Sequence, residues 1–299
     1  MRVRAWSTSA NLGPGYDIMG IAIDAFSDLV EVELVNGGPD AMVIEVSGPY
    51  AKSVPLGRRN SAAAAARAAL KVAEQNLTAK IRLWKGVPPG RGLGSSGASS
   101  AAAVRAVDLA LGGVLSDEDL VRTAAEGERE ASGSPHPDNV APSLFGGLVV
   151  IGRRVVKLDP DVRFVLSVPW TPIPERKTEK MRSLVPKKVD IGEMVRHYSH
   201  LASLLLGLAT GDMRLVGEGM SYSLVDESRS KFIPGYKEVR AAAMRSGALG
   251  VSISGAGPSM LFLCEECDRV AEGVRRAYKG LGIPATVMTV APASGADEV

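Results

Sequence analysis

The stretch Pro88-Pro89-Gly90-Arg91-Gly92-Leu93-Gly94-Ser95-Ser96-Gly97-Ala98 carries the clearest structural signal in this chain. It lies between an alternating run, residues 80–84, that predicts a strand and an Ala-rich run, residues 98–111, that predicts a helix. Glycines let consecutive backbone N–H groups point toward one ligand, and the N-terminus of the following helix adds unpaired donors. The loop therefore predicts a polyphosphate site, in which a serine at the helix start can also reach a bound Mg²⁺ ion.

Three other interpretations compete with this one. A plain flexible turn is the simplest, because small residues also serve turns and close packing. A Walker loop requires a lysine directly after its last glycine, and this loop has none. Residues 92–97 satisfy G-x-G-x-x-G, so a dinucleotide-dependent dehydrogenase is the competing enzyme class. That fold needs a second strand ending in an acidic residue, whereas the acids at residues 117–119 follow Ser116 as a helix cap.

Strand-like and helix-like patterns alternate on both sides of the loop. In the first half we expect helices at residues 61–73, capped by Asn60, and at 116–131, ended by Gly133. Strands are expected at residues 1–6, 29–35, 42–46, 80–84 and 148–151. The turn formers at residues 36–40 predict that 29–35 and 42–46 form an antiparallel pair, and residues 7–17 and 135–142 are expected to be loops.

The second half is predicted to contain a long strand-like run at 155–168 and a mobile loop rich in Pro and charge at 169–186. Helices are expected at residues 190–209, 213–220, 236–246 and 268–278, and strands at 250–253, 259–264 and 285–290. We therefore predict an α+β fold with mixed or antiparallel sheets and packed helices. Its two domains are expected to span residues 1–155 and 156–299.

Composition excludes several functional classes. The 299 residues carry a formal net charge of +2 and only 5% aromatic residues, and basic tracts are missing, so nucleic acid is a poor partner. No apolar run approaches the ~20 residues that a membrane span needs, and no apolar signal segment opens the chain. We expect a cytoplasmic protein. The lone C-x-x-C motif, Cys264 and Cys267, is a weak zinc signal even with His197 and His200 as partners, and a local disulfide is favoured over zinc.

The sequence resembles the GHMP small-molecule kinases in three motifs that occur in the family's order. They are Ser9-Ala10-Asn11-Leu12-Gly13-Pro14-Gly15-Tyr16-Asp17, residues 89–96 of the Gly/Ser loop, and Ser252-Ile253-Ser254-Gly255-Ala256-Gly257-Pro258-Ser259. Within that superfamily it looks like the homoserine kinases, because of Thr8, the run His136-Pro137-Asp138-Asn139-Val140-Ala141-Pro142, and Arg229-Ser230-Lys231-Phe232-Ile233-Pro234. Tyr16 stands where that family more often has Phe, and residues 169–186 match it only loosely.

The resemblance implies a two-domain GHMP kinase fold that binds ATP in the cleft between an N-terminal ATP-binding domain and a C-terminal domain. Ser96 and Glu128 would hold Mg²⁺, although Glu128 taken alone would be a solvated helix residue. The nucleotide would contact Asn60, Pro89, Gly90, Arg91, Gly92, Leu93, Gly94, Ser95, Ser96 and Gly97. L-Homoserine would contact Asn11, Asp17, His136, Asp138, Asn139, Thr178, Arg182 and Arg229, with Asn139, Asp138 and Arg182 closest to the chemistry. A homodimer is a further family-level expectation.

The chemistry of homoserine fits this set of residues. Asp17 and Asp138 can pair with its ammonium, and Arg182 and Arg229 can bind its carboxylate as planar forks. Because Asn139 cannot act as a base, the implied mechanism is positioning with electrostatic stabilisation, and the product O-phospho-L-homoserine belongs to threonine biosynthesis. The alternatives are a kinase of the same fold for mevalonate, a phosphorylated isoprenoid precursor or shikimate, and a nucleotide-binding regulator without turnover. The side chain of Arg91 could face either phosphate or solvent.

Overall fold

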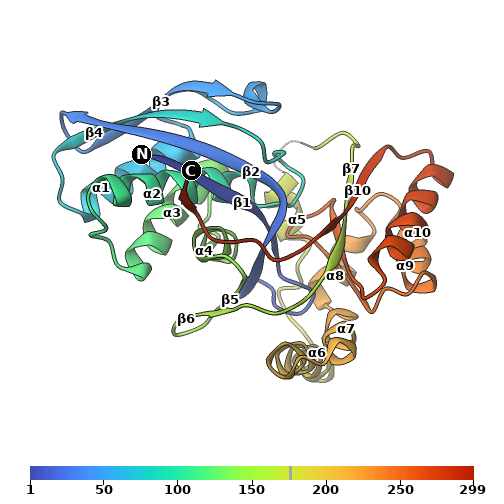
Figure 1. Cartoon of the computed structure of the whole chain (residues 1–299). Helices are drawn as coiled ribbons and strands as arrows, with labels where there is room; N and C mark the ends of the chain where they lie inside the picture. The colour runs from blue at the N-terminus through green and yellow to red at the C-terminus, as the bar shows by residue number, and fades with distance from the viewer. Residues whose placement is uncertain (175–176) are drawn as a thin grey trace.

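The computed structural model describes residues 1–174 and 177–299, which form two sheets with helices packed against them (Figure 1). The first sheet has the strand order β11-β1-β2-β4-β3, and β5 and β6 extend it from β2. Its strands are β1 (Arg2–Ala10), β2 (Met19–Asn36), β3 (Asp40–Ser47), β4 (Leu77–Trp84), β5 (Leu148–Ile151), β6 (Val155–Leu158) and β11 (Asp297–Glu298).

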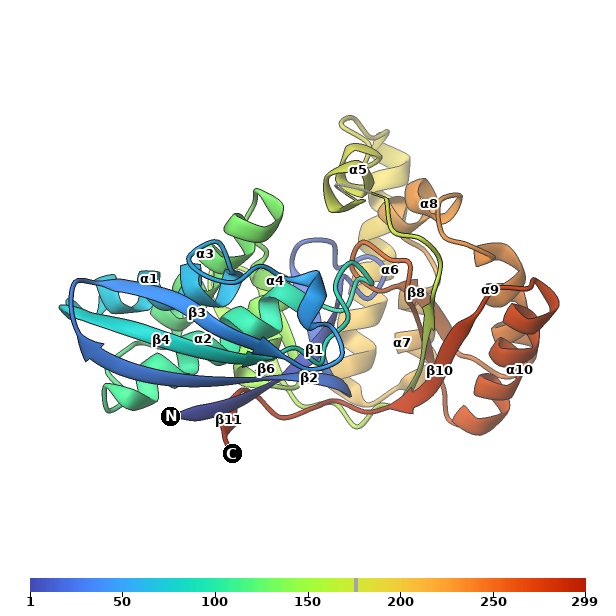
Figure 2. The ribbon, with the colours of Figure 1, turned by 90° about the horizontal axis from the view of Figure 1, so that it is seen from above.

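Helices cover one face of this sheet (Figure 2). They are α1 (Ser61–Val72), α2 (Ser95–Ala110), α3 (Asp117–Ser132) and α4 (Pro137–Phe145), and a short 3₁₀ helix, η1 (Ala51–Ser53), precedes α1. Most alanines of α1 and α2 are fully buried in a core that also takes Val30 and Ile81 from the strands. Because alanine adds little bulk, α1, α2 and α3 pack close together, which places the N-terminus of α2 and the end of α3 beside one another.

The second sheet is antiparallel, with the order β10-β7-β9-β8. Its strands are β7 (Phe164–Pro169), β8 (Gly250–Ile253), β9 (Met260–Leu263) and β10 (Ala285–Val290). The helices of this half are α5 (Lys177–Ser183), α6 (Ile191–Thr210), α7 (Met213–Met220), α8 (Leu224–Ser230), α9 (Tyr236–Arg245) and α10 (Cys267–Gly280). A core cluster joins Ile21 and Leu148 of the first half to Leu166 and Leu204 of the second, so the two halves share buried apolar surface.

The α+β prediction is confirmed, but the expected pairing of 29–35 with 42–46 is wrong. β4 lies between β2 and β3, antiparallel to β2 and parallel to β3. The reason is α1, which carries the chain from β3 back across the sheet to β4 as a crossover connection, and parallel strands require such a connection. Residues 36–40 do reverse the chain, but they join two strands that are not neighbours.

Other boundaries also differ from the expectations. β1 continues to Ala10 and β2 begins at Met19, because a long neighbouring strand supplies backbone partners where propensity is weak. Residues 137–145 form a helix with proline at its start, where the missing N–H costs nothing. The run 155–168 is divided between β6 and β7, which belong to different sheets. The expected mobile loop at 169–186 contains α5; Glu175 and Arg176 of that expectation lie outside the described residues.

The proposed division at residue 155 falls at the start of β6, which still pairs with β5 of the first sheet. β11 returns to β1 from the second half, so the first sheet also holds residues 297–298.

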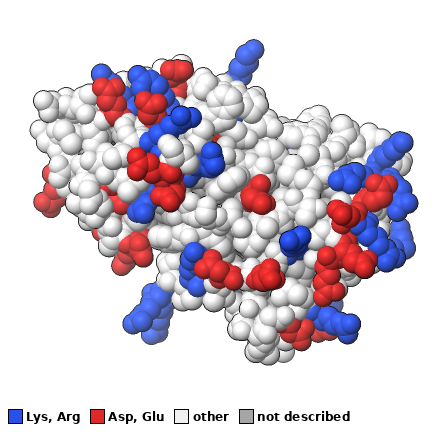
Figure 3. Space-filling model, viewed as in Figure 1, with Lys and Arg blue, Asp and Glu red and all other residues white. Residues whose placement is uncertain are grey.

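Cys264 and Cys267 form a disulfide, which leaves neither as a thiolate ligand for zinc. Across the described ranges, no helix has the length and apolar character that crossing a membrane requires. Lys and Arg are interspersed with Asp and Glu on the face in Figure 3.

Candidate active site

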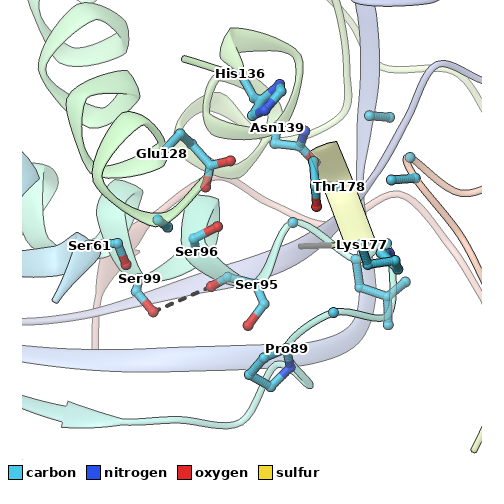
Figure 4. Close-up of a pocket in the computed structure, with 18 of the residues that line it drawn as sticks. Ser61, Pro89, Ser95, Ser96, Ser99, Glu128, His136, Asn139, Lys177 and Thr178 are labelled. Carbon is cyan, nitrogen blue, oxygen red and sulfur yellow. Dashed lines mark hydrogen bonds between the residues drawn. The ribbon is translucent and has the colours of Figure 1, made fainter. Parts of the chain in front are cut away.

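A pocket of about 460 Å³ collects residues from both halves of the chain. Its floor is the Gly/Ser loop and the first turn of α2, and the ends of α3 and α4 form one wall (Figure 4). The second half contributes α5, α8 and the loop between β8 and β9. Of the residues predicted from the sequence, those lining the pocket are Asn11, Asp17, Asn60, Pro89, Gly90, Gly92, Leu93, Gly94, Ser95, Ser96, Glu128, His136, Asp138, Asn139, Thr178, Arg182 and Arg229.

The Gly/Ser loop takes a backbone conformation that favours glycine. Gly90, Gly92 and Gly94 have φ values of +72°, +78° and +61°. A Cβ atom on Gly92 would lie 2.2 Å from the carbonyl oxygen of Ser254, so the loop also packs tightly against the β8–β9 connection. α2 begins at Ser95, directly after the loop, and directs its free N–H groups into the pocket. This arrangement suits an anionic ligand.

A buried ion pair lies beneath the loop. The Lys85 ammonium donates to the Asp28 carboxylate, to the Ser95 carbonyl oxygen at 2.7 Å and to Ser99 Oγ at 3.1 Å. The other oxygen of Asp28 accepts the backbone N–H groups of Gly86 and Val87, both at 2.9 Å. Burial lowers the pKa of Lys85, and the Asp28 charge opposes that change. The pair fixes both the strand before the loop and the helix after it.

Glu128 and Ser96 face one another across the pocket wall (Figure 4). Glu128 is buried on α3, where desolvation raises the pKa of its carboxyl to about 7 against a hydrogen bond from Ser96 and the charge of Lys85. A carboxylate and a hydroxyl beside an anion-binding helix N-terminus are hard oxygen donors of the kind Mg²⁺ prefers. The solvated-face interpretation of Glu128 is therefore wrong, because the side chain points inward.

Charged side chains gather at the opposite end of the pocket. Arg182 donates to both oxygens of Asp17, each at 3.1 Å, and lies 3.3 Å from Nδ1 of His136. Arg229 donates to the carbonyl oxygens of Met181 at 2.9 Å and Gly255 at 3.3 Å. These contacts hold two guanidinium groups and one carboxylate at one end of the same pocket.

Asp138 lies deeper in the same cluster. Its carboxyl, a carboxyl oxygen of Asp17 and a ring nitrogen of His136 all lie within 4.8 Å of one another. Burial, followed by the charges of Asp17 and Glu128, raises the pKa of Asp138 to about 7. Burial and the nearby Arg182 lower the pKa of His136, so its ring favours the neutral form. A cationic ligand group would be stabilised here by both carboxylates.

Asn139 connects this cluster to the Gly/Ser loop. Its Oδ1 accepts from Thr8 Oγ1 at 3.1 Å, and its Nδ2 lies 3.5 Å from Asp138 Oδ1. A Cβ atom on Gly94 would lie 3.1 Å from Asn139 Oδ1, which shows how closely the amide approaches the loop. Asn139 is therefore placed where a group bound by Asp138 would meet one bound by the loop.

Three predicted residues contribute differently from the expectation. The Asn60 amide caps α1 through Ala62 N–H at 3.0 Å and donates to Pro55 at 2.7 Å, so its side chain is engaged by the fold. Arg91 does not line the pocket, and its side chain is partly buried. Its guanidinium turns away to donate to the carbonyl oxygens of Pro169 at 2.7 Å and Thr171 at 2.8 Å, and lies 5.0 Å from the Trp170 ring. Gly97 lies inside the first turn of α2, against Asn139 and Glu128.

Several pocket residues were missed by sequence reasoning. The Tyr16 ring lies 5.2 Å from the Arg229 guanidinium carbon and 5.8 Å from that of Arg182, packing both arginines. Lys177 lines the pocket beside Thr178. Tyr16 lies within the motif at residues 9–17, and that motif could have identified it as a site residue. Lys85 and Lys177 had none, because neither lies in a motif or a periodic pattern that distinguishes it from a surface lysine.

Comparison with known proteins gives a consistent result. The GHMP kinases N terminal domain family matches residues 60–147, and the GHMP kinases C terminal family matches residues 204–280. A homoserine kinase of Aeropyrum pernix is 41% identical, with 100% of this chain and 98% of that protein covered, and one of Thermoplasma volcanium is 40% identical, with 98% and 94% covered.

Solved structures agree with these sequence relatives. The crystal structure of homoserine kinase from Cytophaga hutchinsonii superposes with a TM-score of 0.91 at 30% identity, covering 100% of this chain and 97% of that one. A mevalonate kinase at 15% identity superposes with a TM-score of 0.70, which shows the shared fold. The chain belongs to the GHMP kinase family and resembles that family's homoserine kinases over its full length.

Proposed function

We propose that this protein is a homoserine kinase, which transfers the γ-phosphoryl group of ATP to the hydroxyl of L-homoserine and releases ADP and O-phospho-L-homoserine. The observation that carries the proposal is the pocket itself. One hollow joins an anion-binding loop at a helix N-terminus to a cluster containing two carboxylates and two guanidinium groups. The full-length relatives that share this fold are homoserine kinases.

We assign the Gly/Ser loop and the first turn of α2 to the triphosphate, with Ser96 and Glu128 as the Mg²⁺ ligands. A Mg²⁺ ion held there would neutralise negative charge on the phosphates. Asp28 and Lys85 position the loop beneath the nucleotide through the bonds to Gly86, Val87 and Ser95. Asn60 contributes to the nucleotide end through the wall that its cap stabilises.

The charged cluster suits an amino acid that carries ammonium and carboxylate on one carbon. The carboxylate of homoserine would take the place of Asp17 against Arg182, with Arg229 beside it, and its ammonium would lie between Asp17 and Asp138. An ammonium at that position stabilises the ionised form of Asp138 and so lowers its raised pKa. His136, Asn11 and Thr178 complete the walls around this ligand.

In the transfer, the homoserine hydroxyl oxygen forms a bond to the γ-phosphorus while the bond from that phosphorus to the β-phosphate oxygen breaks. The hydroxyl proton passes to a phosphate oxygen and then to solvent. Asn139 orients the hydroxyl, because its amide lies between the acceptor cluster and the loop. Catalysis in this site would rest on positioning and on fixed donors around the phosphoryl group.

The test is ADP release with Mg-ATP and L-homoserine, L-threonine, mevalonate or shikimate as acceptor. Product is identified by ³¹P NMR. We expect turnover with L-homoserine to exceed that with mevalonate or shikimate by at least ~10²-fold, since a site that pairs both charges of a ligand rejects ligands that lack the ammonium. Preference for mevalonate or shikimate would overturn the assignment of the charged cluster. The cytoplasmic location and the homodimer remain predictions.

A further inference from the structure

Lys177 is the first residue of α5 and lines the pocket on the side of the second half of the chain. Figure 4 places it with Thr178 across the pocket from Ser96 and Glu128, which we assign to the metal. The phosphate loop runs between these two sides. Lys177 is therefore positioned on the flank of the loop that the metal ligands leave uncovered.

Packing holds the Lys177 ammonium close to the loop. Its Nζ donates to the carbonyl oxygen of Gly257. That same oxygen lies 2.8 Å from the position of a Cβ on Gly92, so the amine and the middle of the loop share a neighbour. A Cβ on Gly90 would come within 2.7 Å of Ile173 Cδ1, which shows that the segment leading into α5 packs on the loop as well.

The charges around Lys177 are unusual for a lysine in a pocket. Among residues 1–174 and 177–299, no carboxylate lies within ion-pair distance of its Nζ, and its recorded hydrogen-bond acceptor is a neutral carbonyl. Burial and the charges of Arg229 and Arg91 lower the pKa of Lys177 to about 7. Lys85, the other lysine lining the pocket, is paired with Asp28. Within the described part of the chain, Lys177 thus lacks the anion that Lys85 has.

We propose that Lys177 is a catalytic residue whose ammonium contacts the γ-phosphoryl oxygens of ATP from the side opposite Ser96 and Glu128. This inference rests on the proposed function and assigns the missing anion to the nucleotide. Negative charge on the phosphoryl oxygens is then met from both sides while the bond to the β-phosphate breaks and the bond to the acceptor oxygen forms. A cation placed where charge shifts during transfer stabilises the transition state more than the ground state.

The experiment compares Lys177→Met, Lys177→Gln and Lys177→Arg with Lys180→Met, a control on the same helix whose exposed ammonium lies 5.5 Å from the Phe232 ring. We expect Lys177→Met and Lys177→Gln to lower kcat by about 10²-fold, the usual effect of deleting one transition-state donor. Lys177→Arg should recover at least ~10-fold of that loss, because it restores a cation. Lys180→Met should keep wild-type kcat.

Calorimetry then separates a phosphoryl contact from a structural role. AMP-PNP, which carries a γ-phosphoryl group, should bind Lys177→Gln at least ~5-fold more weakly than wild type, whereas ADP should bind both equally. Gln keeps a donor for the Gly257 carbonyl, so this variant tests the charge even if Lys177→Met melts at a lower temperature. Equal losses for AMP-PNP and ADP, or wild-type kcat in Lys177→Gln, would overturn the proposal.

An inactive Lys177→Arg with unchanged AMP-PNP affinity would also overturn it, since that result indicates that the amine acts as a base on the acceptor hydroxyl. The binding arm does not depend on homoserine. If homoserine turnover is absent but the AMP-PNP difference is present, the acceptor assignment fails and the Lys177 contact stands. If turnover is present and the AMP-PNP difference is absent, the homoserine assignment stands and the Lys177 contact fails.

Discussion

Glu128 illustrates how far one side chain's role depends on its surroundings. It belongs to a helix whose other acids, including Glu126, are partly or fully exposed, yet its own carboxylate faces Ser96 in the pocket. We expect Glu128→Gln to lower kcat by about 10²-fold and to raise the Mg²⁺ concentration that gives half-maximal rate, because an amide is a poorer Mg²⁺ ligand than a carboxylate. Initial rates over a Mg²⁺ series would measure both effects.

The matched control is Glu126→Gln, whose side chain pairs with Arg129 at the surface. It should leave the Mg²⁺ dependence unchanged. Glu128→Gln should also melt at the same or a higher temperature at pH 8, because burial disfavours the ionised carboxylate that the amide replaces. An unaltered Mg²⁺ dependence in a folded Glu128→Gln protein would remove Glu128 from the metal site.

Site residues could be predicted only where a motif or the family resemblance marked them. Asp17, Asp138 and Arg229 lie within motifs or runs that resemble known families, and the structure brings them into one pocket. The Asp28–Lys85 pair was not predictable, since its members lie 57 residues apart and each looks like an ordinary strand residue. Lys177 was missed for the same reason. Such contacts depend on the tertiary arrangement of the sheets and helices.

At the level of elements, the phosphate loop allows a comparison between two glycines. Gly92 and Gly112 both have positive φ values, +78° and +89°, but only a Cβ on Gly92 would meet backbone within 4 Å among the described residues. We expect Gly112→Ala to cost about 1–2 kcal/mol of stability, the backbone penalty alone. Gly92→Ala should in addition displace the β8–β9 connection and weaken ATP binding by at least ~10-fold.

Chemical denaturation and calorimetry with AMP-PNP measure the two quantities. Wild-type nucleotide affinity in Gly92→Ala would show that the loop and the β8–β9 connection can separate without consequence for the ligand. The comparison isolates the close approach from the φ preference, because both variants share the latter.

Arg91 links the phosphate loop to the end of β7. Its two bonds to the carbonyl oxygens of Pro169 and Thr171, and its stacking on Trp170, join segments about 80 residues apart. We expect Arg91→Ala to raise the KM for ATP by about 3- to 10-fold, because losing two charge-assisted bonds costs roughly 1–3 kcal/mol, part of which the ligand must restore. Kinetics at saturating homoserine would measure this, with the exposed Arg153→Ala as control. A KM equal to that of wild type would show that the link serves stability alone.

Elements with strong local signals were predictable, and pairings were not. α1, α3 and α6 lie where helices were expected, and each is preceded by a capping side chain, from Asn60, Ser116 and Asp190. The partner of β3 was mispredicted, because a turn sequence reports only that the chain reverses. β4, which follows β2 and β3 in the sequence, lies between them in the sheet because α1 carries the chain back across it. A short stretch of sequence does not show the direction of such a crossover. α4 was missed because its prolines resemble loop residues.

At the scale of the whole molecule, buried carboxylates make folding depend on pH. Asp226 in α8 accepts the Ile253 N–H at 2.9 Å, and desolvation raises its pKa to about 7. A folded pKa above the unfolded value of ~4 contributes stability in full below pH ~4, and this contribution is lost as the pH rises through about 7. Asp226→Asn keeps an acceptor for Ile253 and removes the titration.

We therefore expect the stability of Asp226→Asn relative to wild type to increase from pH 5 to pH 8 by at least ~1 kcal/mol, since one unit of pKa shift corresponds to ~1.4 kcal/mol. Urea denaturation of both proteins across that range would measure it. Taking the difference between the two proteins removes the opposite contribution of His136, whose pKa is lowered. A difference that does not vary with pH would contradict the assignment of a raised pKa to Asp226.

The return of the chain from the second sheet to the first also brings its two ends together. β11 pairs with β1 through Val3 and Glu298, and the Val299 N–H donates to the Arg2 carbonyl oxygen at 3.0 Å (Figure 1). A short peptide linker could therefore join residue 299 to residue 1 with little distortion. The chain could then be reopened in the exposed turn at Gly152, between β5 and β6. Such a circular permutant would keep every strand neighbour while moving the new ends to the turn between the last two strands of the first sheet before the chain crosses to the second.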